Sequence, residues 1–346
     1  MYTGKADRNA VYKTHKFFNR ECKKGRSLFF LSVISAILAG TVFTGCRRAD
    51  DLVQEQAEPE NYALTVFTAQ ERKEWEPVIK EFEERTGWNV RVETGSAKEM
   101  LSQLEKEEAD WDVAFGVSAD ALEEGKEYWQ TGKDAWTGYS AVSFVILYNT
   151  NVVTYRELPT GWDSLLEPRW KGRVAVPDPL KSDMAASVLT EAAKNSEKEE
   201  FLDLLAENMQ YQMPETFKEV EQGISDGRYS IGVTSEEAAK AMLAAGQDVD
   251  YIDPEEGECF FEDGTAIRKR TPNLDASEAF VTYTTCDDTK WLLRTQLLRQ
   301  PAEDVAAEND RSDEDLKQRY SRQQEVLNIW KLIMEEKSGS AHEQEQ

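Results

Sequence analysis

Residues 64–95 read LTVFTAQERKEWEPVIKEFEERTGWNVRVETG, and the order of elements in this stretch indicates the fold. A short apolar strand over residues 63–67 leads into a helix whose apolar positions recur at helical spacing, until Gly87 ends it. A second strand covers residues 89–93, and a third follows a further helix at residues 112–116. This alternation of strand and helix predicts a parallel, doubly wound α/β sheet.

Serine and threonine residues stand where the predicted strands give way to helices. Three of them fit the capping-box spacing, in which an acid follows three residues later: Thr68 with Glu71, Ser96 with Glu99, and Thr234 with Glu237. Three others also open helices: Ser118, Ser182 and Thr216. Plain helix capping is the ordinary role of such residues. In a doubly wound sheet they also lie at the carboxyl ends of strands, where free N–H groups and the helix dipole favour anions.

The start of the chain predicts export and lipid anchoring. A basic segment precedes an apolar run over residues 28–43, which is short for a membrane span, and the run ends in Thr44-Gly45-Cys46. This order resembles the lipobox of bacterial lipoproteins, in which the cysteine is lipidated, although Phe43 stands where leucine is usual. An uncleaved N-terminal anchor is the alternative. In either case the rest of the chain is expected outside the cytoplasmic membrane, held there through Cys46 or the anchor.

Charge narrows the range of partners. The chain of 346 residues has a net charge of −25. Its first 45 residues carry eight basic and two acidic residues, so the part from Cys46 onward has a net charge of −31. Such a charge argues against a nucleic-acid partner and against electrostatic attraction to anionic lipid. We therefore expect acyl chains to supply the membrane attachment.

Histidine and cysteine are scarce, and this excludes several chemistries. The two histidines, His15 and His342, lie near the ends of the chain, so nucleophilic triads and zinc sites built on histidine are not expected. Of the four cysteines, Cys259 and Cys286 remain for the folded part. An oxidising compartment allows them to pair, but two isolated cysteines are more often unpaired small hydrophobic residues.

Several segments resemble extracellular solute-binding proteins of ABC importers, in the group that takes ferric iron, hexose phosphates and phosphonates. The resemblance covers residues 63–330, about four fifths of the chain. Its most specific blocks are LPTGWDSLLEPRWKGRVAVPDPLKSDMAAS (158–187) and SFVILYNTNVV (143–153). Weaker similarity lies in the opening stretch, in WDVAFGVSADAL (111–122), in GRYSIGVTSEEAAKAM (227–242) and in IDPEEGECFFEDGTAI (252–267).

The resemblance implies a type II periplasmic-binding fold, in which two doubly wound α/β lobes are joined by a two-strand hinge and close over a ligand. It places the crossings near residues 148–150 and 248–253. The expected organisation is a signal peptide (1–45), a polar tether (46–61), lobe 1 (62–149), lobe 2 (150–252), a return to lobe 1 with a C-terminal helix packed on it (253–337), and a disordered tail (338–346). The implied partners are a small-molecule ligand and the membrane subunits of an ABC permease, with the protein itself a monomer.

The implied ligand site gathers the turns after the strands of both lobes. The expected ligand-binding residues are Thr68, Ala69, Gln70, Ser96, Ser118, Tyr139, Ser182, Asp183, Thr216, Thr234 and Glu236. No catalytic residue, metal ligand or cofactor is predicted. The expected ligand is a phosphorylated or otherwise anionic organic solute.

Two features of the sequence restrict the class of ligand further. Ferric-iron binders of the family use adjacent tyrosines in the second lobe, whereas the corresponding stretch here, residues 210–216, holds one tyrosine. A high-affinity ferric site is therefore not expected. The turns also contain acids, such as Asp183 and Glu236, where phosphate binders are rich in serine and glycine. These acids fit helix first turns, sugar hydroxyls and a cation equally well.

Two other functions compete with transport. The same fold can serve as a sensor that presents its ligand state to a membrane histidine kinase, and neighbouring genes for a permease or for a kinase would separate the two. A hydrolase with a pair of carboxylates is the enzymatic alternative. It is disfavoured because no motif singles out such a pair.

Overall fold

The computed structural model describes residues 62–130, 135–257, 259–306 and 313–344. The predicted signal peptide, Cys46 and the tether lie outside these residues. From residue 63 onward the chain forms one compact unit. None of the helices in the described ranges is both long enough and apolar enough to cross a membrane.

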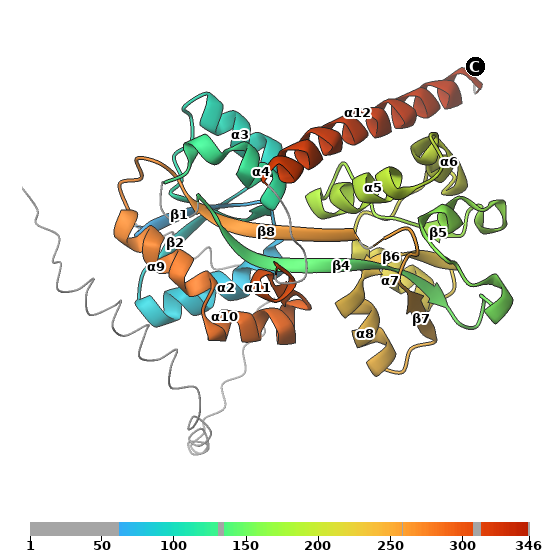
Figure 1. The fold of residues 1–346 in the computed structure, drawn as a ribbon, viewed down its shortest axis with the longest axis horizontal. Helices are drawn as coiled ribbons and strands as arrows, with labels where there is room; N and C mark the ends of the chain where they lie inside the picture. The colour runs from blue at the N-terminus through green and yellow to red at the C-terminus, as the bar shows by residue number, and fades with distance from the viewer. Residues whose placement is uncertain (1–61, 131–134, 258, 307–312, 345–346) are drawn as a thin grey trace, which may run out of the picture. The chain divides into compact units, whose positions relative to one another are not determined.

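The sheet opens with the predicted alternation (Figure 1). β1 (Leu64–Thr68) pairs in parallel with both β2 (Val90–Thr94) and β3 (Val113–Ser118). Three helices follow these strands in turn: α2 (Arg72–Thr86), α3 (Ala97–Glu105) and α4 (Ala119–Glu124). The apolar face of α2 is buried, and Gly87 ends the helix in the left-handed conformation with φ of 70°.

Some helices begin at other residues than predicted. Ser96 and Glu99 do form a capping box on α3. In contrast, α2 begins after Glu71, whose backbone N–H donates to the Glu74 side chain at 3.1 Å. Thr68 is still part of β1, and Thr234 is still part of β6 (Ile231–Ser235), where it pairs with β4. Both predictions were wrong because the strand ladder extends further than the apolar run.

Two long antiparallel strands connect the lobes. β4 (Thr137–Asn149) pairs with β8 (Cys259–Ile267) over residues 137–144, and with β6 over residues 144–148. β7 (Val249–Ile252) continues beside the end of β4. The chain therefore crosses within β4 and returns along β8, rather than near residues 148–150 and 248–253. The sequence does not mark these points, because β4 is an almost uninterrupted run of buried residues.

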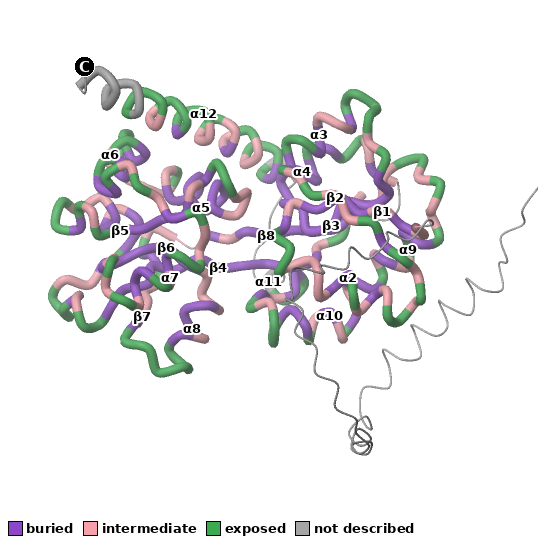
Figure 2. Tube along the Cα trace, turned by 180° about the vertical axis from the view of Figure 1, so that it is seen from behind, coloured by how far each residue is buried: buried purple, intermediate pink, exposed green. Residues whose placement is uncertain are grey.

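The sheet order is β2-β1-β3-β8-β4-β6-β5, with β5 (Val174–Ala175) parallel to β6. Four helices cover the second half: α5 (Asp183–Asn195), α6 (Phe201–Asn208), α7 (Phe217–Ser225) and α8 (Glu236–Ala244). We call β1–β3 with α2–α4 the first lobe, and β5–β7 with α5–α8 the second lobe. Each lobe has its own buried cluster of apolar side chains, and Figure 2 shows the buried residues concentrated along the strands.

After β8 the chain returns to the first lobe and then spans both. It forms α9 (Leu274–Thr284), α10 (Asp287–Leu292), a π-helical turn (Leu293–Leu297), β9 (Gln300–Pro301), α11 (Ala302–Ala306) and α12 (Asp313–Gln344). α9 begins after Asn273. Cys259 and Cys286 are buried and unpaired.

The C-terminal helix reaches further than predicted. α12 contacts α4 of the first lobe and also α5 and α6 of the second (Figure 1). Arg319 lies between Asp120 of α4, at 3.7 Å, and Glu191 of α5, at 3.3 Å. Trp330 is buried in the apolar cluster of the second lobe. The helix also continues to Gln344, over most of the tail predicted to be disordered, since helix propagation is favourable once a long helix has formed.

Candidate functional site

A cavity of about 470 Å³ is lined by both lobes and by the strands that connect them. The first lobe supplies Ala69, Gln70, Glu71, Lys73, Glu74, Gly116 and Ser118. The second supplies Pro177, Lys181, Ser182, Asp183, Met184, Glu215, Thr216, Phe217, Lys218, Glu221, Ser235 and Ala238. Val142, Phe144, Phe261 and Asp263 come from β4 and β8, and residues 296–299 come from the turn after α10. This volume lies in the range of pockets for small organic ligands.

Helix N-termini from both lobes meet at this cavity. The residues that precede α2, α4, α5, α7 and α8 all line it: Glu71, Ser118, Ser182, Thr216 and Ser235. Each of the four hydroxyls accepts a backbone N–H of its own helix, at 3.2–3.4 Å. The hydroxyl hydrogens remain to be donated, and the positive ends of the helix dipoles face the same space.

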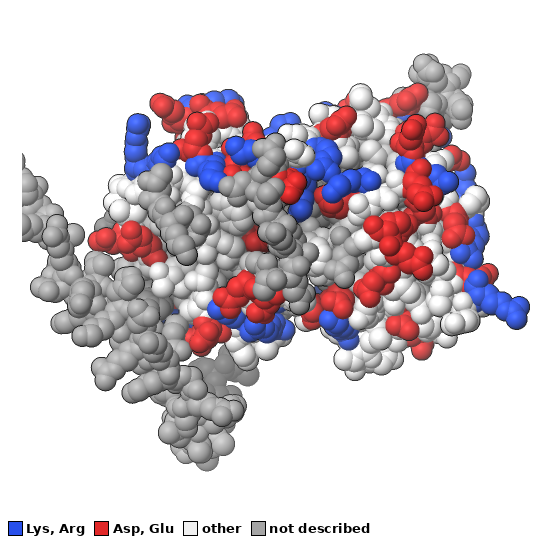
Figure 3. Space-filling model, viewed as in Figure 1, with Lys and Arg blue, Asp and Glu red and all other residues white. Residues whose placement is uncertain are grey.

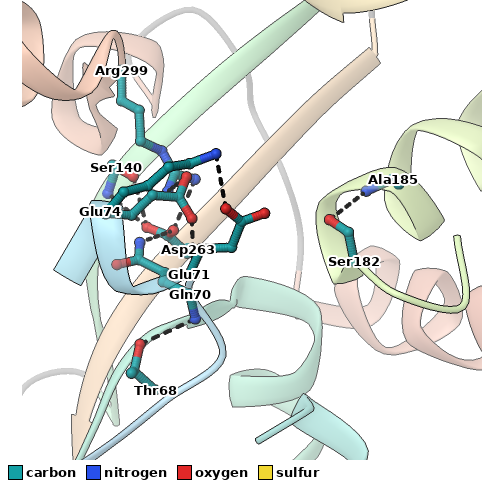
Figure 4. Close-up of polar contacts among 10 residues, drawn as sticks. Thr68, Gln70, Glu71, Glu74, Ser140, Ser182, Ala185, Asp263 and Arg299 are labelled. Atoms are coloured by element: carbon teal, nitrogen blue, oxygen red, sulfur yellow. Dashed lines mark hydrogen bonds and ion pairs between the residues drawn. The ribbon is translucent and has the colours of Figure 1, made fainter. Parts of the chain in front are cut away.

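A buried ion pair supports the first-lobe side of the cavity (Figure 4). Asp263 is 0% exposed, and its Oδ2 lies 2.9 Å from Nη2 of Arg299, which is 4% exposed. Asp263 also accepts hydrogen bonds from Nε2 of Gln70, at 2.9 Å, and from the Ser140 hydroxyl, at 2.8 Å. Glu74 lies 3.6 Å from Nη1 of Arg299. Burial opposes the charge on Arg299, but Asp263 and Glu74 more than offset it and raise the pKa of Arg299.

Gly116 leaves the space that the Gln70 side chain occupies. It has φ of 62° and lies where β3 shifts its register with β8. A Cβ at this position would lie 2.3 Å from Cδ of Gln70, so the amide packs directly against the glycine backbone. Oε1 of Gln70 and Nε of Arg299 are buried and make no hydrogen bond within the described chain.

Cations and acids alternate around the opening. Lys73 pairs with Glu71 at 2.8 Å, and Lys181 pairs with Glu215. Lys218 makes no ion pair with any described residue. Glu221 accepts a hydrogen bond from the Thr234 hydroxyl at 2.7 Å; burial raises its pKa, and Thr234, Lys73 and Lys218 oppose that rise. Burial likewise raises the pKa of Asp183, against the effect of the Ala97 N–H that it accepts at 3.2 Å from the first lobe.

The structure brings together six of the predicted ligand-binding residues at the cavity: Ala69, Gln70, Ser118, Ser182, Asp183 and Thr216. It places the others elsewhere. Thr68 and Thr234 are fully buried beneath the turns, and Tyr139 is buried against Phe115, with ring centroids 4.7 Å apart. Ser96 is exposed and caps α3, while Glu236 pairs with Lys240 at 2.9 Å.

The most important residues that sequence reasoning missed are Asp263 and Arg299. Asp263 stands in a strand of otherwise largely apolar, alternating character, and a carboxylate on the buried face of such a strand is a usable signal. Arg299 follows the π-helical turn and has no motif around it. Its pairing with Asp263 joins residues far apart in sequence, so it could be recognised only in the folded chain.

Two lobes that line one cavity, with connecting strands between them, are typical of proteins that bind a small ligand between hinged lobes. The chain belongs to the family of bacterial extracellular solute-binding proteins, whose family model matches residues 115–324. That family consists of binding proteins and not of enzymes.

Individual relatives agree with this assignment. The chain is 21% identical to iron uptake protein A1 of Synechocystis sp., over 81% of this chain and 84% of that protein. Two solved structures share the fold. AfuA from Actinobacillus pleuropneumoniae, with bound fructose 6-phosphate, has a TM-score of 0.64 at 14% identity and covers 79% of this chain and 98% of its own. The ferric binding protein from Campylobacter jejuni has a TM-score of 0.63 at 17% identity, covering 78% and 99%.

Proposed function

We propose that this protein captures a small organic anion, such as a phosphorylated solute, between its two lobes and delivers it to an ABC permease. The convergence of helix N-termini from both lobes on one cavity is the observation that carries the proposal. Their N–H groups, the hydroxyls of Ser182 and Thr216, and the rim lysines suit oxygen-rich anionic groups. Figure 3 shows acidic and basic side chains interspersed over the visible face, without an extended basic patch that would suggest a polyanion.

Ligand binding is expected to bring the lobes together. A ligand favours the closed state only by its differential affinity for it, so contacts on both lobes are required. The cavity meets this condition, because Ser118 belongs to the first lobe and Ser182 and Thr216 to the second. Lys73 of the first lobe and Glu221 of the second also line the cavity with opposite charges.

A ligand screen tests the proposal. The full-length protein is heated with phosphate, sugar phosphates, phosphonates, sugar acids, polyamines and ferric iron, and the shift in melting temperature is measured. We expect an organic anion to give the largest shift and to reduce the radius of gyration in X-ray scattering. A larger shift with a polyamine than with every anion would contradict the proposal. The role in the cell is a separate question. If the response of cells to the ligand requires a histidine kinase and not the permease, the protein is a sensor and not a transport protein.

Ferric iron remains the most direct competitor, because one relative is named as an iron uptake protein. Among the residues that the structure describes, no tyrosine lines the cavity. Within the described residues, no cluster of three or more His, Cys, Asp and Glu side chains could hold a metal. We therefore expect no tyrosinate-to-iron absorption band on addition of Fe³⁺. A visible band that Tyr211→Phe abolishes would contradict this expectation.

The position at the membrane is also a proposal. Cys46 follows the order basic, apolar and small that precedes lipidated cysteines, and we infer that it bears the lipid anchor. Cys46→Ala should leave the precursor unprocessed or release the protein from the membrane. Normal labelling of this variant with a radioactive fatty acid would rule out Cys46 as the attachment site.

A further inference from the structure

The cavity has an apolar side that the proposed anion does not explain. Five lining residues with apolar side chains that are not fully buried come from both lobes: Ala69, Met184, Phe217, Leu297 and Leu298. One of them, Phe217, stacks on the buried Phe144, with ring centroids 5.5 Å apart and an angle of 23° between the rings. A phosphate or a metal ion alone would leave this surface in contact with water, at a cost proportional to its area.

Leu298 is the most informative member of this side. It is 38% exposed and has φ of 51°, a left-handed conformation that is strained for a branched side chain. The described chain holds five non-glycine residues with positive φ, and Leu298 is the one among them that lines the cavity. Glycine or asparagine would occupy such a position at lower cost. Leu298 therefore offers a partly exposed apolar side chain to a ligand in the cavity.

The surrounding structure holds Leu298 in place. The π-helical turn Leu293–Leu297 ends immediately before it, and the N–H of Arg299 donates to the carbonyl of Leu293 at 3.1 Å. Arg299 is in turn fixed by the ion pair with Asp263, and its guanidinium lies 5.8 Å from the centroid of Phe261. β9 then pairs with β4. Leu298 is therefore presented to the cavity from a rigid support on the first-lobe side.

Polar groups lie next to the apolar ones on the second lobe. Thr216 caps α7, Phe217 is its first residue, and Lys218 follows with no ion-pair partner among the described residues. At the start of α5, Ser182 is the cap and Met184 is the second residue of the helix, after Asp183. A ligand that reaches these helix N-termini with an anionic group would thus place its body against Phe217 and Met184, opposite Leu298.

We propose that the ligand is an amphiphilic organic anion, with a phosphate or carboxylate at the helix N-termini and an apolar, preferably planar, body between Leu298 of the first-lobe side and Met184 and Phe217 of the second lobe. This inference rests on the proposed function and narrows it, because it excludes inorganic phosphate and disfavours fully hydroxylated sugar phosphates. The cavity of about 470 Å³ has room for a ring in addition to the anionic group.

The test compares anions that share a head group. Isothermal titration calorimetry of the full-length protein is run with phenyl phosphate, glucose 6-phosphate and inorganic phosphate, and with phenylacetate against gluconate. The aromatic member of each set should bind about tenfold more tightly, the ratio expected from burying one ring face. If glucose 6-phosphate or inorganic phosphate binds as tightly as phenyl phosphate, the apolar-body inference is wrong and the anion proposal stands. If no anion binds, both are wrong.

Variants locate the effect on the proposed surface. Leu298→Ala and Met184→Ala should each reduce the preference for phenyl phosphate over glucose 6-phosphate by about threefold or more. Leu243→Ala is the matched control, since Leu243 is also 38% exposed but does not line the cavity, and the preference should not change. An unchanged preference in both cavity variants would overturn the inference, whatever their melting temperatures.

Discussion

The two lobes present similar helix N-termini to the cavity but support them differently. On the first-lobe side, Gln70 and Arg299 are fixed by Asp263, and all three side chains are almost completely buried. On the second lobe, Ser182 and Thr216 are partly exposed, and the lysines around them lie at the surface. Altering the first-lobe side should therefore cost stability, whereas altering the second lobe should mainly cost binding.

Removal of Asp263 should have the largest effect. Asp263→Ala leaves the Arg299 guanidinium buried without its carboxylate, and also deprives Gln70 and Ser140 of their acceptor. Breaking a buried ion pair on one side typically costs about 3–5 kcal/mol of the free energy of unfolding. Urea denaturation followed by circular dichroism measures it. Glu207→Ala, which breaks the exposed pair with Lys171, should change the midpoint little; equal losses in the two variants would contradict the contrast.

Gly116→Ala should have the next largest effect. The new Cβ would lie 2.3 Å from Cδ of Gln70, which cannot move without losing its hydrogen bond to Asp263, and the φ of 62° adds strain. We expect a loss of about 3 kcal/mol in the free energy of unfolding. Gly246→Ala separates the two causes, because Gly246 has φ of 73° but open space around it. It should lose only about 1 kcal/mol. A similar loss in both variants would mean that the contact with Gln70 is unimportant.

The same contrast explains what the sequence could predict. The alternation of strands and helices over residues 64–118 is local, because each apolar face and each capping residue lies within one element, and this part of the fold was predicted correctly. The helix caps Ser182 and Thr216 of the second lobe were also predicted from the sequence, and their part in ligand binding stays a prediction. Helix-cap residues of this kind can be recognised from their position in the sequence alone.

The rest depends on contacts between distant segments. The crossing within β4 could not be predicted, because the partner changes from β8 to β6 without any change in the character of the strand. The Asp263–Arg299 pair joins β8 to the turn before β9, and neither residue has a local motif. Thr234 and Ser235 differ by one position in the strand ladder, and that single register step places Ser235 in the cavity and Thr234 beneath it.

A pair of helix caps separates binding from stability. Ser182 and Ser96 each cap a helix by accepting a backbone N–H, but only Ser182 lines the cavity. Ser182→Ala and Ser96→Ala should both lower the free energy of unfolding by about 1 kcal/mol. Only Ser182→Ala should also weaken ligand binding, by about 1 kcal/mol in calorimetry with the anion that the screen identifies. Equal affinities in the two variants would place the ligand away from α5.

The smallest expected effect is a pH-dependent gain from Glu221→Gln on the second lobe. Burial raises the pKa of Glu221, so the folded state binds a proton more tightly than the unfolded chain, whose glutamate has a pKa of about 4.3. Stability is therefore lost as the pH rises through the unfolded pKa towards the folded one. Glutamine removes this cost and can still accept the hydrogen bond from Thr234. The urea midpoint of Glu221→Gln should exceed that of the wild type at pH 7, and the difference should vanish as the pH falls below about 4. A difference that instead grows towards acidic pH would show that Glu221 is stabilising as a carboxylate, held by Lys73 and Lys218, and that the second lobe relies on charge as the first one does.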